Sequence, residues 1–190
     1  MRSRTLAALC AVSFSLVATQ VQAQEIFGAK LTHQLTPPQF CTIKKGVMCS
    51  WVMREAQGQP GRLKAPRDGR IAKIRLVACA PRGSFVLQIV RTKNTPESAR
   101  AVSTGPVINY NGTKRNCRAS RNFDIEEFNV DVPVKRGDQL AVIATEVRFM
   151  YSSSSGPSIM YDPPLAEGDG FRTTELASGF LMLQAEMAPP

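Results

Sequence analysis

Apolar and polar residues alternate along two stretches of the chain. This period of two is typical of a β-strand with one face in a core and the other in solvent. The first stretch is SFVLQIVRT, residues 84–92, and the second is EFNVDVPV, residues 127–134. The apolar positions that share a face are Phe85, Leu87 and Ile89 in the first, and Phe128, Val130, Val132 and Val134 in the second.

The rest of the chain repeats this pattern in short pieces. Clusters of Gly, Pro, Asn and Ser, such as NYNGTKRN and SSSSGP, separate the apolar runs, and no stretch shows a helical stripe. The sequence therefore predicts an all-β fold, an antiparallel β-sandwich of about eight or nine strands. Pro133 should then lie at a sheet edge or a strand end, where its missing N–H does no harm. Further strands are expected at residues 47–54, 70–79, 99–104, 139–148, 158–161 and 180–187.

The stretch VPVKRGDQLAV contains Arg136-Gly137-Asp138, a tripeptide by which extracellular proteins bind cell-surface receptors. Alternating residues run into it and an apolar strand runs out of it. The four residues from Lys135 to Asp138 have the length and chemistry of a hairpin connection, with Gly137 free to adopt positive φ. We interpret the tripeptide as a turn and not as an adhesion signal.

Several segments, in this order, resemble a broad group of exported bacterial jelly-roll or galactose-binding-like proteins, most of which have no assigned activity. They are LKAPRDGRIAKIRL, FVLQIVR, FNVDVPVKRGDQLAV, YDPPL and LMLQAEM, spanning about residues 63–187. The resemblance implies a sandwich of jelly-roll type. The chain departs from the group in Cys79, Cys117 and the basic insertion NGTKRNCRASR, so the resemblance transfers no binding residues.

Residues 1–23 have the features of a signal peptide. Arg2 and Arg4 precede an apolar run at residues 6–18 that is too short to span a bilayer, and Val21-Gln22-Ala23 after it has the small-x-small pattern that signal peptidase cleaves. The mature protein is expected in the periplasm or outside the cell, and no later segment has the length and apolarity of a membrane helix. Residues 24–39 are expected to form a flexible leader, and residues 40–190 a single β-sandwich domain.

Four cysteines remain after removal of the signal peptide. An even number in an oxidising compartment indicates two disulfides, with three connectivities open. Pairing between sequence neighbours, Cys41 with Cys49 and Cys79 with Cys117, is preferred. Zinc is the competing interpretation, but the chain has no CxxC pair, and its single histidine is His33.

The chain is basic, and loss of the two arginines of the signal peptide lowers the formal charge from +9 to +7. This charge favours a glycan or another acidic polymer as partner; nucleic acid is not expected. The densest cationic cluster is the segment 109–121, and two further tyrosines bracket a serine-rich loop. Solvated loops and core packing are the alternatives. The candidate ligand-binding residues are Tyr110, Lys114, Arg115, Arg118, Arg121, Tyr151 and Tyr161.

The segment YDPPLAEGDGF concentrates Asp162, Glu167 and Asp169 around glycine and proline. Oxygen-rich loops of this kind can hold Ca²⁺, although the spacing matches no defined calcium loop. The alternative is a solvated turn. No other cofactor is expected.

The sequence argues against common catalytic arrangements. A Ser-His-Asp triad needs a histidine near the nucleophile, and His33 falls in the expected leader. Glu126 and Glu127 are adjacent on a predicted strand and so point to opposite faces. A non-catalytic glycan- or polyanion-binding protein is therefore preferred. Two alternatives stay open: an enzyme acting on extracellular polysaccharide or ester bonds with acids from residues 121–127 and 162–169, and a structural subunit of a surface assembly.

Overall fold

The computed structural model describes most of residues 24–190. Its description leaves out residues 1–23, 32–34, 36–37, 42–45, 54–61, 80, 95–96, 113–123, 152–157, 174–175 and 178. The expected signal peptide therefore lies outside the described residues. So do all four basic residues that were predicted to bind a ligand: Lys114, Arg115, Arg118 and Arg121.

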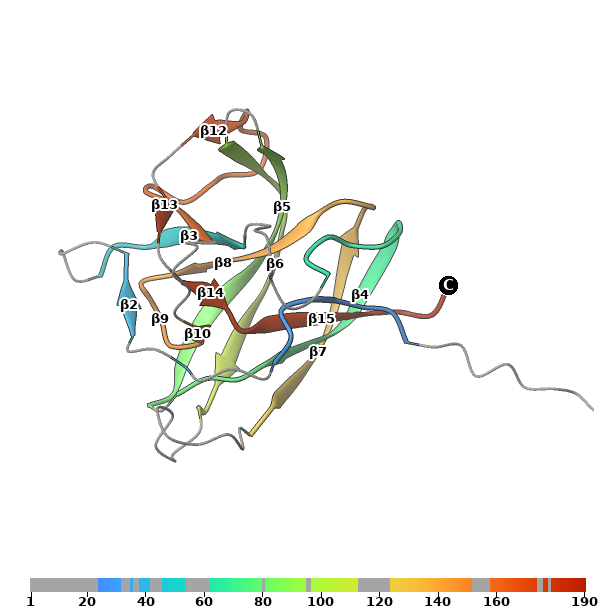
Figure 1. Ribbon diagram of the computed structural model, residues 1–190, viewed down its shortest axis with the longest axis horizontal. Helices are drawn as coiled ribbons and strands as arrows, with labels where there is room; N and C mark the ends of the chain where they lie inside the picture. The colour runs from blue at the N-terminus through green and yellow to red at the C-terminus, as the bar shows by residue number, and fades with distance from the viewer. Residues whose placement is uncertain are drawn as a thin grey trace, which may run out of the picture.

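The described chain is all β (Figure 1). No helix in it is long and apolar enough to cross a membrane. Seven strands have five or more residues, and six have only two. The strands are β1 (Ile26–Gly28), β2 (Gln39–Phe40), β3 (Cys49–Met53), β4 (Gly69–Leu76), β5 (Gly83–Asn94), β6 (Glu97–Tyr110), β7 (Glu126–Val134), β8 (Gln139–Ala144), β9 (Glu146–Val147), β10 (Met150–Tyr151), β11 (Ser158–Tyr161), β12 (Arg172–Thr173), β13 (Leu176–Ala177), β14 (Phe180–Leu181) and β15 (Leu183–Met187).

Two antiparallel sheets carry the fold. The smaller has the order β1-β15-β4-β7, and the larger has the order β12-β6-β5-β8-β3-β11-β13. Two short pairs, β2 with β9 and β10 with β14, accompany them. The prediction of an antiparallel, sandwich-like all-β protein is confirmed, and every long strand expected from the alternation is present.

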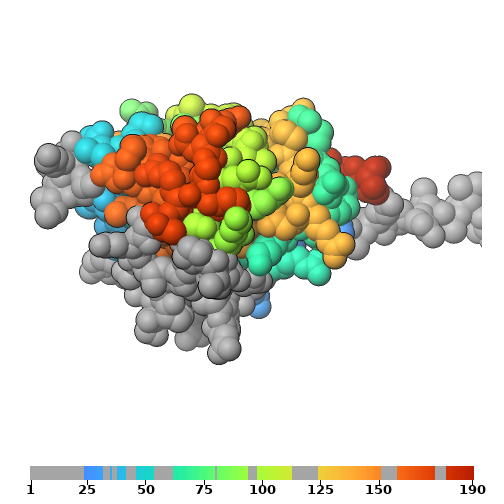
Figure 2. Space-filling view, turned by 90° about the horizontal axis from the view of Figure 1, so that it is seen from above, coloured from blue at the N-terminus to red at the C-terminus, as the bar shows by residue number. Residues whose placement is uncertain are grey.

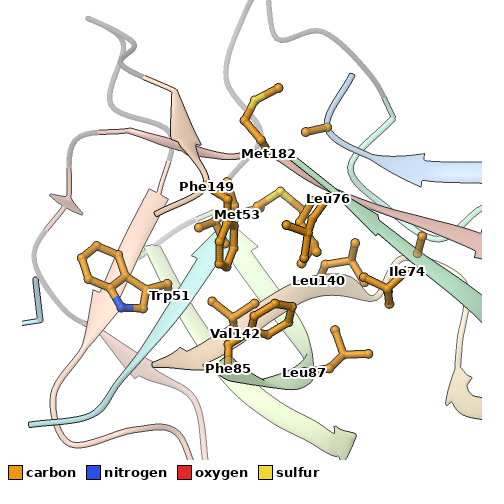
Figure 3. Close-up of a cluster of buried hydrophobic side chains, with 14 of the residues drawn as sticks. Trp51, Met53, Ile74, Leu76, Phe85, Leu87, Leu140, Val142, Phe149 and Met182 are labelled. Carbon is orange, nitrogen blue, oxygen red and sulfur yellow. The ribbon is translucent and has the colours of Figure 1, made fainter. Parts of the chain in front are cut away.

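The main core lies between the two sheets (Figure 3). The smaller sheet contributes Ile74 and Leu76 from β4, whereas the larger contributes residues from β3, β5 and β8. The face predicted for SFVLQIVRT is confirmed, because Phe85, Leu87 and Ile89 are all buried. Burial of each such side chain stabilises the fold by about 1.5–3 kcal/mol.

A second, smaller apolar cluster lies on the other face of the seven-stranded sheet. Leu165, from the loop after β11, packs there against residues of β3, β5, β6, β8 and β11. The sheet is therefore covered on both faces at this end, which explains why every residue of β3 is buried. The remaining members are Val52, Val90, Ala99, Ala101, Ala141, Ile159 and Tyr161.

The connection between β7 and β8 is the predicted hairpin turn. Gly137 has a φ of +87°, and the backbone N–H of Lys135 donates to Asp138 Oδ2 at 2.9 Å. β7 is the edge strand of its sheet, so Pro133 lies where the pattern required. The exposure of β7 alternates along its length, as expected.

Asp138 joins this turn to two other parts of the chain. Its side chain is fully buried, and its Oδ1 accepts hydrogen bonds from Arg91 Nε at 2.9 Å and Nη2 at 2.6 Å. Its carbonyl accepts from Ala65 N at 2.8 Å, and Gly137 N donates to Ala65 O. The aspartate of the Arg-Gly-Asp tripeptide is thus occupied inside the protein and is not presented to a receptor.

A short paired strand lies within residues 24–39, the segment expected to be a leader. β1 pairs with β15 as the edge of the smaller sheet, and Phe27 is buried. Gly28 adopts a φ of +103°, and an added Cβ would lie 2.6 Å from Leu183 O, so only glycine fits. A three-residue strand has one inward residue, which is too few to produce a period-two pattern.

Cys41 and Cys49 form a disulfide, which confirms the first expected pairing. Cys79 is also disulfide-bonded. Its expected partner, Cys117, lies outside the described residues, so that pairing stays a prediction.

The buried ion pair gives a test of the fold. Asp138→Ala removes two charge-assisted hydrogen bonds and the acceptor of the turn, so we expect the free energy of unfolding to fall by about 3 kcal/mol. Urea denaturation measures this change. The control is Asp68→Ala, which removes an exposed carboxylate that accepts one hydrogen bond, from Arg136 N, and should cost about 1 kcal/mol. Equal costs for the two variants would contradict the central role of Asp138.

Candidate functional site

Two cations meet one aromatic ring at the end of the β5–β6 hairpin. Lys93 Nζ lies 4.0 Å from the centroid of the Phe171 ring, and Arg100 Cζ lies 5.1 Å from it. Lys93 comes from β5, Arg100 from β6, and Phe171 from the loop that precedes β12. We call these three residues the cation–aromatic cluster.

The register of the hairpin explains why the cations share a face. Arg91 on β5 pairs with Arg100 on β6, and Lys93 follows two residues after Arg91, so all three side chains leave the same face. Like charges directly opposite one another repel. Asp138 compensates the charge of Arg91. Among the carboxylates whose side chains the structure describes, none forms an ion pair with Lys93 or Arg100.

The loop of residues 162–171, which carries Phe171, is held in place at its start. Arg172 Nη1 donates to the carbonyls of Pro163 and Pro164 at 3.0 and 3.2 Å, and Nη2 donates to the carbonyl of Asp162 at 3.4 Å. The same guanidinium lies over the Tyr161 ring, 5.8 Å from its centroid. One arginine therefore orders the turn that leads to the cluster.

A buried hydrogen-bonded triangle attaches this loop to the larger sheet. Ser50 Oγ donates to Gln88 Oε1 at 2.8 Å, Gln88 Nε2 donates to Leu165 O at 2.9 Å, and Leu165 N donates to Ser50 Oγ at 2.9 Å. Each buried polar atom of the triangle thus has a partner. In Figure 2 the loop, in orange to red, lies directly against β6, in yellow-green.

The three residues proposed for calcium make separate contacts. Glu167 Oε1 accepts a hydrogen bond from Thr104 N at 2.6 Å, beside the short bridge between Glu167 and Ala101. Asp169 N donates to Ala166 O within a turn. Asp162 lies next to the Cys41–Cys49 disulfide instead. Within the described part of the chain these three carboxylates do not form one cluster of ligand atoms.

Two of the three tyrosines proposed as ligand-binding residues are buried in apolar clusters. Tyr110 is buried, and its ring lies 6.2 Å from Phe85 and 5.8 Å from Phe149 between centroids. Tyr161 is buried in the second apolar cluster. Neither ring offers a face to a ligand. The side chain of Tyr151 lies outside the described residues.

Two acids of the enzymatic alternative, Glu126 and Glu127, make structural contacts. Glu126 and Glu127 leave opposite sides of β7, as predicted. Glu126 accepts hydrogen bonds from the backbone N–H groups of Asn111 and Gly112 at 2.8 and 2.7 Å. Glu127 pairs with Lys73 and with a neighbouring arginine, and the hydrogen bond from Lys73 is the main cause that lowers the pKa of Glu127. A carboxyl with a lowered pKa is a poor general acid at neutral pH.

Glu127 belongs to a ladder of paired charges on the outer face of the smaller sheet. Arg70 pairs with Asp131, and Lys73 and Arg75 both pair with Glu127. Each of these cations therefore has a carboxylate partner on the same sheet. This face therefore contrasts with the hairpin end, where the described carboxylates leave two cations unmatched.

A hollow of about 720 Å³ lies near the first described residues. Among the described residues that line it, Arg67 is the basic one; it donates to Glu25 Oε2 at 2.5 Å and to Ala188 O at 2.6 Å and so has little capacity for a ligand. The lining residues are Gln24, Glu25, Arg67, Met187, Ala188, Pro189 and Pro190.

No protein-family model, no curated protein and no solved structure matches this chain. The contacts described above are therefore the basis for any proposal about function.

The sequence did not predict the cation–aromatic cluster, because Phe171 is far from the hairpin in sequence and the pairing of β12 with β6 brings it there.

The buried tyrosines predict a response to alkaline pH. Burial raises the pKa of both Tyr110 and Tyr161 from 10 to about 12. Their stabilising contribution is complete below pH 10 and is lost as the pH rises to about 12, because the unfolded chain ionises first. Urea denaturation at several pH values should show this decline.

The double variant Tyr110→Phe and Tyr161→Phe removes both titrating groups and is the matched comparison. Its free energy of unfolding should decline less between pH 10 and pH 12 than that of the wild type. Parallel declines in the two proteins would show that the tyrosines do not resist ionisation.

Proposed function

We propose that this chain is an exported, non-catalytic β-sandwich protein of the jelly-roll group that binds an anionic glycan or another acidic envelope polymer. The cation–aromatic cluster is the contact site. The observation that carries the proposal is the pair of cations over Phe171 that no described carboxylate neutralises. Lysine and arginine in such a setting donate charge-assisted hydrogen bonds to carboxylate, sulfate or phosphate groups.

Three features favour binding at the cluster. The ring restricts both side chains before a ligand arrives, which reduces the entropy lost on binding. The loop that carries Phe171 is ordered by Arg172 and by the buried triangle around Gln88. The positive net charge of the chain adds long-range attraction for a polyanion.

The test is retention on an immobilised acidic polysaccharide over a range of salt concentrations. The double variant Lys93→Ala and Arg100→Ala should bind about tenfold more weakly at low salt, because two exposed ion pairs of about 0.2–1 kcal/mol each are lost. Retention of the wild type should fall as salt screens the charges.

Two further variants separate the cluster from net charge alone. Lys30→Ala with Arg82→Ala removes two exposed cations away from the cluster, with the same change in net charge, and should retain nearly wild-type binding. Phe171→Leu keeps every charge and should weaken binding by releasing the two cations. Equal weakening in the two charge variants, with Phe171→Leu unchanged, would overturn the assignment of the site.

A further inference from the structure

Three atoms capable of binding a metal converge at the corner where β3 begins and β11 ends. They are Cys41 Sγ, Cys49 Sγ and a carboxylate oxygen of Asp162, and all lie within 4.8 Å of one another. Both cysteines are buried, whereas Asp162 is exposed. In the disulfide form the sulfurs are bonded to each other, so the carboxylate alone can act as a ligand.

Each of the three residues is positioned by contacts that do not depend on the disulfide. Cys49 is the first residue of β3, which is paired on both sides by β8 and β11. The backbone N–H of Cys41 donates to Thr145 O at 3.2 Å. Asp162 directly follows β11, and its carbonyl accepts from Arg172 Nη2. The corner can therefore persist when the sulfur–sulfur bond is opened.

We propose that reduction of the Cys41–Cys49 bond converts this corner into a binding site for a thiophilic divalent cation of the Zn²⁺ type. Two thiolates and one carboxylate are a donor set that Zn²⁺ accepts, at about 2.3 Å to sulfur and about 2.0–2.2 Å to oxygen. A tetrahedron with these bonds places its ligand atoms about 3.5–3.8 Å apart. The carboxylate oxygen already lies within 4.8 Å of both sulfurs, and opening the bond would let the two sulfurs move apart to this spacing. The exposed side, next to Asp162, leaves the fourth position for water.

The chemistry balances with a dithiol as the reductant. The dithiol gives two electrons and two protons to the sulfur–sulfur bond, leaves as its own disulfide, and yields two protein thiols. The cation then displaces both thiol protons and binds the thiolates together with the Asp162 carboxylate. The disulfide and the metal site are thus alternative states of one corner. Both join Cys41 to Cys49, so the metal would restore a cross-link that reduction removes.

The experiment uses the chain reduced by a phosphine under nitrogen and titrated with Co²⁺, which reports thiolate ligands by a charge-transfer absorption. The reduced wild type should take up one Co²⁺ per chain and release it to Zn²⁺. The variant Cys41→Ser with Cys49→Ser keeps the other cysteines of the chain and should lose this absorption, which separates the proposed site from their thiols.

Asp162 is tested by a matched pair of carboxylate variants. Asp162→Asn should weaken Co²⁺ binding about tenfold or more, since an anionic ligand becomes a neutral amide. Asp169→Asn, in the same loop, should bind as the wild type does. A reduced wild type without the absorption, or wild-type affinity in Asp162→Asn, would overturn the proposal.

Thermal melting tests the proposal even if reduction of the disulfide lowers the stability of the fold. A cation that binds the folded form raises its Tm. Zn²⁺ should therefore raise the Tm of the reduced wild type but not that of the double serine variant. No shift in either protein would also overturn the proposal. Binding of acidic polysaccharide is measured separately, so neither result depends on the other.

Discussion

The buried ion pair between Asp138 and Arg91 is the constraint on which the arrangement of this sandwich depends. A fully buried carboxylate is costly unless it is paired and hydrogen-bonded. Asp138 meets that requirement by joining Arg91 in β5 to the β7–β8 turn, while its backbone joins Ala65 in the segment before β4. β7 belongs to one sheet and β8 to the other. The pair therefore fixes the connection between the two layers and, through β5, the start of the hairpin end that carries the cation–aromatic cluster.

Much of this architecture could be predicted from residue patterns. Phe85, Leu87 and Ile89 are buried as their spacing required, and Gly137 takes the positive φ that the turn needs. These features depend on local sequence: the period of a strand and the chemistry of a four-residue turn. The edge strand β1 could not be predicted in this way. Its pairing with β15 joins residues near opposite ends of the chain, and only the tertiary fold specifies that contact.

The candidate site was harder to predict, because it depends on which charges are neutralised. The sequence shows a basic segment and scattered acids, but it does not show that Glu127 serves Lys73 or that Asp138 serves Arg91. It also gave no sign that Tyr110 would be buried among core aromatics. Cross-strand register decides these outcomes, and register between distant strands is set by the whole sheet and not by any short motif.

The pairing of charges gives a reason why excess positive charge would act at one end of the molecule. On the outer face of the smaller sheet, each cation of the ladder pairs with a carboxylate on the neighbouring strand. At the β5–β6 hairpin, Asp138 is buried and pairs with Arg91, so among the described carboxylates only Asp138 relieves the repulsion between Arg91 and Arg100. Phe171 stabilises the remaining two cations through its ring but adds no negative charge. An anionic ligand would supply the negative charge that the described carboxylates do not provide here, and the same contacts that order the loop would hold the two cations in position to receive it.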